Sequence, residues 1–200
     1  MKNEKLKILV ECAVMVALST VLSFITIYHA PLGGSVTLCS MAPLILISCM
    51  HGVGPGLASA FVHSVLQLLF GLANFSYIPD AKGMVLCAFF DYILPFTLVG
   101  AAGMFVKKHS EKPGTVPVLG GVLTVMVAKY ACHVVAGAVV WYSITKAGEW
   151  NDVVNRLGMW SYSLFYNAWF SVPETVITLV AVPAVISAVY AIYRPKPEDR

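Results

Sequence analysis

The 200-residue sequence is 58% hydrophobic and only 12% charged, and its mean hydropathy is +0.80. Soluble domains are about 45–50% apolar and about 25% charged, so this composition excludes a water-soluble globule and indicates a protein that lies in a lipid bilayer. The net charge of +3 is small, and no nucleic-acid partner is expected.

Six apolar segments are candidates for membrane-spanning helices, each of which needs roughly 20 apolar residues. The second segment is short and covers only about 22 Å as a helix, so we expect it to be tilted or shielded by its neighbours. The sequence therefore predicts a single-domain (1–200), all-α membrane protein with six transmembrane helices. These helices are expected at about 6–28, 36–50, 57–72, 84–106, 116–144 and 160–193.

Positive charges are unevenly divided between the two ends of these helices. Nine are on the side of the termini: Lys2, Lys5, Lys7, Lys107, Lys108, Lys112, Arg194, Lys196 and Arg200. Three are on the other side: Lys82, Lys146 and Arg156. Because cytoplasmic loops carry the excess of Lys and Arg, both termini are predicted to be cytoplasmic. The loops at 29–35, 73–83 and 146–159 are then extracellular.

Motifs for reaction chemistry are missing from the sequence. There is no HExxH, GxSxG or GxxxxGK[ST] pattern, so no catalytic residue, cofactor or ATP hydrolysis is expected. The five cysteines lie in apolar runs without a CxxC pair, which is typical of packing residues rather than of disulfides or a metal site.

Ionisable and amide side chains inside apolar segments are costly, and they usually mark function or a specific pairing. We expect Lys129 to pair with a carboxylate or a helix end, and Glu174 to be a structural partner or to lie near a helix surface. For His63 and Gln67 two interpretations stay open, namely a functional role or a link between the third and second helices. The full set is His63, Gln67, Asp91, Lys129, His133, Asn167 and Glu174.

A stripe of residues spaced by four follows one face of the fifth helix: Lys129, His133, Gly137 and Trp141. Gly137 has no side chain, so a ligand or another backbone can approach there. Asp91 lies about seven residues into the fourth helix, roughly 10 Å below its outer end. A carboxylate at this depth should be paired or should meet a cationic ligand.

Tyr162, Tyr166 and Asn167 lie within two turns of the outer end of the sixth helix. Aromatic faces attract flat rings and cations, and a carboxylate accepts N–H bonds or balances a positive charge. An asparagine amide supplies both a donor and an acceptor. Together with Asp91 and Trp141, these groups predict a site for a flat, cationic, amino-bearing heterocycle.

Several stretches resemble a known family. They are Lys129-Tyr130-x-x-His133-x-x-x-Gly137-x-x-x-Trp141, Tyr162-Ser163-Leu164-x-x-Asn167, Asp91-Tyr92 and Gly33-Gly34-Ser35. This pattern resembles the thiamine-specific substrate-binding (S) components of energy-coupling factor (ECF) transporters, and the resemblance covers most of the chain.

The resemblance implies a six-helix S-component fold in a bacterial cell membrane and thiamine binding at the extracellular face. It also implies docking on an ECF transmembrane coupling subunit and two ATP-binding cassette ATPases. Some members carry a tryptophan where this chain has Gly34, and an aromatic residue where it has His63. The candidate ligand contacts are Asp91, Tyr92, His133, Trp141, Tyr162 and Asn167, together with Gly34, His63 and Tyr77.

Ala13 and Ala17 near the N-terminus resemble the small-xxx-small stripe with which such proteins dock on their membrane partner. The two residues share a helix face and permit another helix to approach closely. They are the candidate partner-docking residues.

Two alternatives to thiamine binding stay open. One is an S component for another heterocycle, such as a thiamine precursor pyrimidine. The other is an intramembrane enzyme or a self-sufficient secondary transporter, since Asp91 and His133 are able to form a facing pair. The ligand that copurifies with the protein distinguishes them, because thiamine, a bare pyrimidine and a converted product differ in mass.

Overall fold

The computed structural model describes residues 2–30, 33–106, 113–150 and 152–193. Its α-helices are α1 (Lys2–Phe24), α2 (Ala42–His51), α3 (Val53–Phe70), α4 (Ala81–Cys87), α5 (Leu94–Val99), α6 (Thr115–Ala136), α7 (Tyr142–Ala147), α8 (Asp152–Arg156) and α9 (Met159–Tyr193). Two segments, η1 (Leu72–Tyr77) and η3 (Ala102–Phe105), are 3₁₀-helical, whereas η2 (Ala88–Ile93) and η4 (Gly137–Trp141) are π-helical. The described residues also form two strands, β1 (Thr26–His29) and β2 (Ser35–Thr37).

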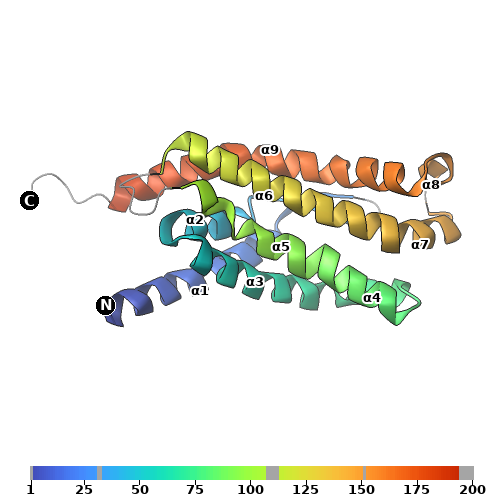
Figure 1. Cartoon of the computed structure of the whole chain (residues 1–200), viewed down its shortest axis with the longest axis horizontal. Coiled ribbons are helices and arrows are strands. Elements are labelled where there is room, and N and C mark those ends of the chain that lie inside the picture. Colours follow the sequence, from blue (N-terminus) through green and yellow to red (C-terminus); the bar gives the residue numbers. More distant parts are fainter. Residues whose placement is uncertain (1, 31–32, 107–112, 151, 194–200) are drawn as a thin grey trace, which may run out of the picture.

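The helices form an elongated bundle in which α1 begins and α9 ends at the same end of the molecule (Figure 1). Because η2 joins α4 to α5 and η4 joins α6 to α7, these segments form two nearly continuous long helices. Among the described residues, five helices are long and apolar enough to cross a membrane: Asn3–Phe24, Val53–Phe70, Ala81–Phe105, Thr115–Ala147 and Met159–Ile192.

The number of membrane crossings and the side of the termini stay predictions. The short second segment corresponds to α2, which has ten residues and covers about 15 Å. Six of the charges used to predict orientation lie outside the described residues, namely Lys107, Lys108, Lys112, Arg194, Lys196 and Arg200.

Helix α2 is enclosed by the rest of the bundle, as its short length led us to expect. Residues Ala42–Cys49 are all buried, and they pack in one core with apolar residues of α1, α3, α6 and α9. Near α2, the backbones of α3 and of the residue that follows α5 are in direct contact, since a Cβ on Gly100 would overlap the backbone of Gly56. The core therefore closes the bundle on the side of the termini.

Strands β1 and β2 form a short antiparallel hairpin among the helices of the described residues. In it Tyr28 pairs with Val36 and His29 with Ser35. Its strands lie where a loop at 29–35 and the start of the second helix were expected. The helix predicted from residue 36 begins at Ala42 instead. β-branched residues on both sides of a glycine pair favour extended strands and a turn over a helix.

The hairpin packs against α9. The indole N–H of Trp169 donates to the Tyr28 hydroxyl oxygen at 2.9 Å, and the Tyr166 hydroxyl donates to the Gly33 carbonyl at 2.9 Å. Gly34 has a φ of +85°, and a Cβ at this position would overlap the Phe170 ring. Only glycine satisfies both the left-handed backbone and this close contact. The hairpin is thereby held over the side of the bundle where the site lies.

Candidate functional site

A cavity of about 740 Å³ lies between the hairpin, η2, α6–η4 and α9. This volume is within the range of small-molecule sites, about 300–1,000 Å³. Lys129 and Thr145 both line it and are 16 residues apart on a nearly continuous helix, so the lining residues of this helix extend over about 24 Å. Eight of the nine candidate ligand contacts line it: Gly34, Tyr77, Asp91, Tyr92, His133, Trp141, Tyr162 and Asn167.

The carboxylate of Asp91 is held from two sides within this cavity. Its Oδ2 atom accepts a hydrogen bond from Trp141 Nε1 at 2.6 Å, and its Oδ1 atom lies 3.1 Å from His133 Nδ1. With Asp91 ionised, its carboxylate only accepts hydrogen bonds, and His133 Nδ1 is then the donor of this second contact. Cys87 on the preceding turn also contacts Oδ2 at 3.6 Å. The expectation that Asp91 is paired is met by three side chains on two helices.

Both Asp91 and Trp141 lie in π-helical turns, η2 and η4 respectively. Such turns are rare and occur frequently at functional sites. The predicted stripe on the fifth helix is confirmed, since Lys129, His133, Gly137 and Trp141 all line the cavity. At Gly137 the close neighbours are side chains of α9, because a Cβ there would overlap Ser163 and Asn167.

Helix α9 supplies an aromatic and amide wall. The rings of Tyr162 and Tyr166 are stacked, with centroids 5.8 Å apart and an interplanar angle of 21°. The Asn167 amide nitrogen donates to the carbonyl and to the hydroxyl of Ser163, at 2.9 and 3.1 Å. These local bonds use its donors, so the Asn167 carbonyl oxygen is the part of the amide that can serve a ligand.

Lys129 and Glu174 form a buried ion pair with Nζ and Oε2 2.6 Å apart. The expectation of structural partners is confirmed for both residues. The other carboxylate oxygen accepts from the Thr37 hydroxyl at 3.4 Å, which ties the pair to the hairpin. Both charged residues line the inner part of the cavity.

His63 and Gln67 connect α3 to α1, so the alternative in which they link the third helix to the second is wrong, and Gln67 also lines the cavity. His63 Nδ1 lies 3.3 Å from the Thr20 hydroxyl, and Gln67 Nε2 donates to Ser23 at 2.8 Å. His63 is fully buried and does not line the cavity; its ring packs edge-on against Phe96, which does. Sequence alone does not show which helices are neighbours.

Sequence reasoning missed Phe170 and Trp150, which also line the cavity. Phe170 was detectable, because it is four residues after Tyr166 and therefore shares its helix face. Trp150 lies in a connecting segment, where no helical period applies. Ala13 and Ala17, the candidate docking residues, are exposed on α1 and are not among the lining residues.

A family model described as Thiamine transporter protein matches residues 9–193. The chain belongs to this thiamine transporter family. A thiamine transporter ThiT of Bacillus subtilis is 30% identical over 190 residues, covering 90% of this chain and 91% of the relative. A thiamine transporter ThiT of Lacticaseibacillus paracasei is 25% identical over 195 residues, covering 93% and 90%.

The fold is shared with a solved structure of ThiT from Listeria monocytogenes. The TM-score is 0.73 at 23% sequence identity, and the match covers 96% of this chain and 100% of the other. This member of the thiamine transporter family is a multi-pass membrane protein.

Proposed function

We propose that this chain is the thiamine-binding S component of an ECF-type vitamin importer. The observation that carries the proposal is the Asp91 carboxylate, held by His133 and Trp141 in a cavity with aromatic walls. It supplies negative charge and hydrogen-bond acceptors beside the aromatic rings of the cavity. The names of the bacterial relatives support thiamine as the ligand.

Thiamine contains an aminopyrimidine ring and a positively charged thiazolium ring, and both classes of group have a counterpart in the cavity. The amino group suits the carboxylate of Asp91 and the carbonyl oxygen of Asn167 as acceptors. The flat rings suit the faces of Trp141, Tyr162 and Tyr92. The proposed contacts are Asp91, Tyr92, His133, Trp141, Tyr162 and Asn167. Two further proposed contacts are Gly34, between the strands of the hairpin, and Tyr77, at the end of η1.

Isothermal titration of the purified protein with thiamine tests the ligand. We expect tight, one-to-one binding and much weaker binding of the neutral aminopyrimidine half, which lacks the cation. Mass spectrometry of any ligand released on denaturation identifies what the protein captured. Tighter binding of the pyrimidine than of thiamine would favour the precursor importer, and a chemically converted product would favour an enzyme.

Transport is proposed to need an ECF transmembrane coupling subunit and two ATP-binding cassette ATPases, because the sequence contains no ATP-binding loop. In this arrangement both termini are cytoplasmic and the cavity opens to the outside. Uptake by the chain alone, in vesicles without any ATPase, would contradict the ECF assignment and favour a self-sufficient carrier.

Replacing Ala13 or Ala17 by leucine is expected to abolish assembly with the coupling subunit and uptake, while thiamine binding is unchanged. Both residues are exposed on α1, so added bulk blocks the approach of a partner helix without disturbing the cavity. Copurification, vesicle uptake with internal ATP, and titration of the isolated variant are the measurements. Ala58→Leu, at an exposed position of α3, is the matched control. Loss of thiamine binding would contradict the docking role.

A further inference from the structure

Helix α7 ends in a tight and unusual turn at the start of its connection to α8. The Trp150 amide donates to the Thr145 carbonyl at 3.2 Å, and the Glu149 amide donates to the Lys146 carbonyl at 3.3 Å. These two bonds define a Schellman motif, whose left-handed residue is usually glycine. Here that residue is Glu149, with a φ of +51°. A non-glycine residue in this conformation is maintained only where its surroundings require it.

The turn brings the Trp150 ring back over the helix it follows. A Cβ on Gly148 would overlap the indole ring, so the absence of a side chain at Gly148 is what admits it. The ring then meets Tyr77 of η1 edge-on, with centroids 5.5 Å apart and an interplanar angle of 84°. Two connections that are far apart in the sequence thus place their aromatic rings together.

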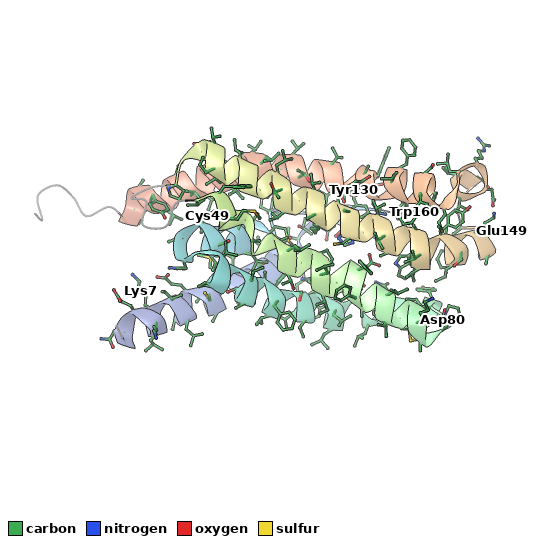
Figure 2. All side chains as sticks on the ribbon, viewed as in Figure 1. Lys7, Cys49, Asp80, Tyr130, Glu149 and Trp160 are labelled. Atoms are coloured by element: carbon green, nitrogen blue, oxygen red, sulfur yellow. The ribbon has the colours of Figure 1, made fainter. Side chains whose placement is uncertain are left out.

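This aromatic pair, Tyr77 and Trp150, lies at the boundary between cavity and surroundings. Both residues line the cavity, yet Tyr77 is 56% exposed and Trp150 42% exposed. The neighbouring Glu149 lies at the end of the bundle opposite Lys7, where Asp80 also lies (Figure 2). We therefore infer that Tyr77 and Trp150 flank the opening of the cavity at this end of the bundle.

An interfacial tryptophan belt does not account for Trp150. Trp160 at the start of α9 fits such a belt, because it is 49% exposed and is not among the residues that line the cavity. Trp150 instead turns inward through a strained turn and a glycine contact.

We propose that Trp150 contacts the ligand and, together with Tyr77, binds its cationic ring at the entrance and slows its release. The inference rests on the proposed thiamine-binding function. Asp91 and Asn167 offer acceptors deeper in the cavity, which suits the amino-bearing neutral ring there. The positive ring then lies outermost, where two aromatic side chains attract a cation.

Stopped-flow measurement of thiamine release tests the proposal. Trp150→Ala is expected to release thiamine about tenfold faster, whereas Trp150→Phe keeps most of the slow release because it retains an aromatic face. Gly148→Ala should reproduce the alanine effect by displacing the ring. Trp160→Ala, a matched tryptophan outside the cavity, should behave as the wild type.

A second ligand separates contact from a structural effect. The neutral aminopyrimidine half of thiamine lacks the cationic ring, so the wild type and Trp150→Ala should bind it equally well. If Trp150→Ala weakened the binding of thiamine and of the aminopyrimidine half equally, Trp150 would be a structural residue and the proposal would be overturned. Unchanged release of thiamine from Trp150→Ala would overturn it as well. A wild-type protein that binds no thiamine would instead overturn the proposed function, and this proposal with it.

Discussion

Replacing Asp91 by asparagine is expected to weaken thiamine binding by more than tenfold. Hydrogen bonds to charged groups contribute about 1.5–3 kcal/mol, and the variant loses the negative charge that faces the cationic ligand. It also places an amide N–H₂ donor against either Trp141 Nε1 or His133 Nδ1, which are donors themselves. The side chain at position 91 therefore loses its charge and one of its two acceptor oxygens. Isothermal titration measures the effect.

Asp152→Asn is the control for the Asp91 variant, because it removes the same charge at an exposed position on α8. It should leave affinity unchanged. A retained affinity in Asp91→Asn would show that the carboxylate only orders Trp141 and His133. An interaction between Asp91 and Lys129 does not complicate the comparison, since Lys129 is paired with Glu174.

The second large effect is expected at the Lys129–Glu174 pair. Removing one partner leaves an uncompensated charge in the interior, which costs about 3–5 kcal/mol in the free energy of unfolding. Both residues are nearly inaccessible, with exposed fractions of 5% and 4%. Lys129→Met and Glu174→Gln should therefore each lower the melting temperature in detergent. The double variant should recover most of the loss, because no charge is then left alone.

Lys7→Met provides a matched control for the buried pair. Lys7 is 3.8 Å from Glu11, and its side chain is 65% exposed, so we expect a loss of only about 0–1 kcal/mol. Equal stability of the wild type and both single buried variants would contradict the structural role. A double variant that is no more stable than the singles would show that each charge has further partners.

The features that sequence predicted best follow from periodicity and from the cost of polar groups in lipid. His133, Gly137 and Trp141 share a helix face by spacing alone, and that face lines the cavity. Asp91 and Lys129 were singled out because each interrupts an apolar run. Their partners were not predictable, because pairing depends on the rotation and depth of one helix relative to another.

Other features depend on contacts that no local pattern contains. The hairpin is held by Tyr166 and Trp169 of α9, which lie 133 and 141 residues further along the chain than the residues they contact. Trp150 lines the cavity only because Glu149 adopts a left-handed conformation, which a non-glycine residue gives no reason to expect. The attachment of His63 to α1 likewise reflects the order of helices in space.

The two π-helical turns set a limit on how this chain can change its length in evolution. A π turn corresponds to an α-helix with one residue inserted, so deleting one residue from 88–93 or 137–141 would restore a regular helix. Because the π turn absorbs the extra residue, the helix on either side would keep nearly its present orientation, but the side chains within the former π turn would point in new directions. Asp91 and Trp141 would separate, even though every side chain of the site were still present. Insertions and deletions should therefore be rarer in these two helical segments than in the loops at the bundle ends.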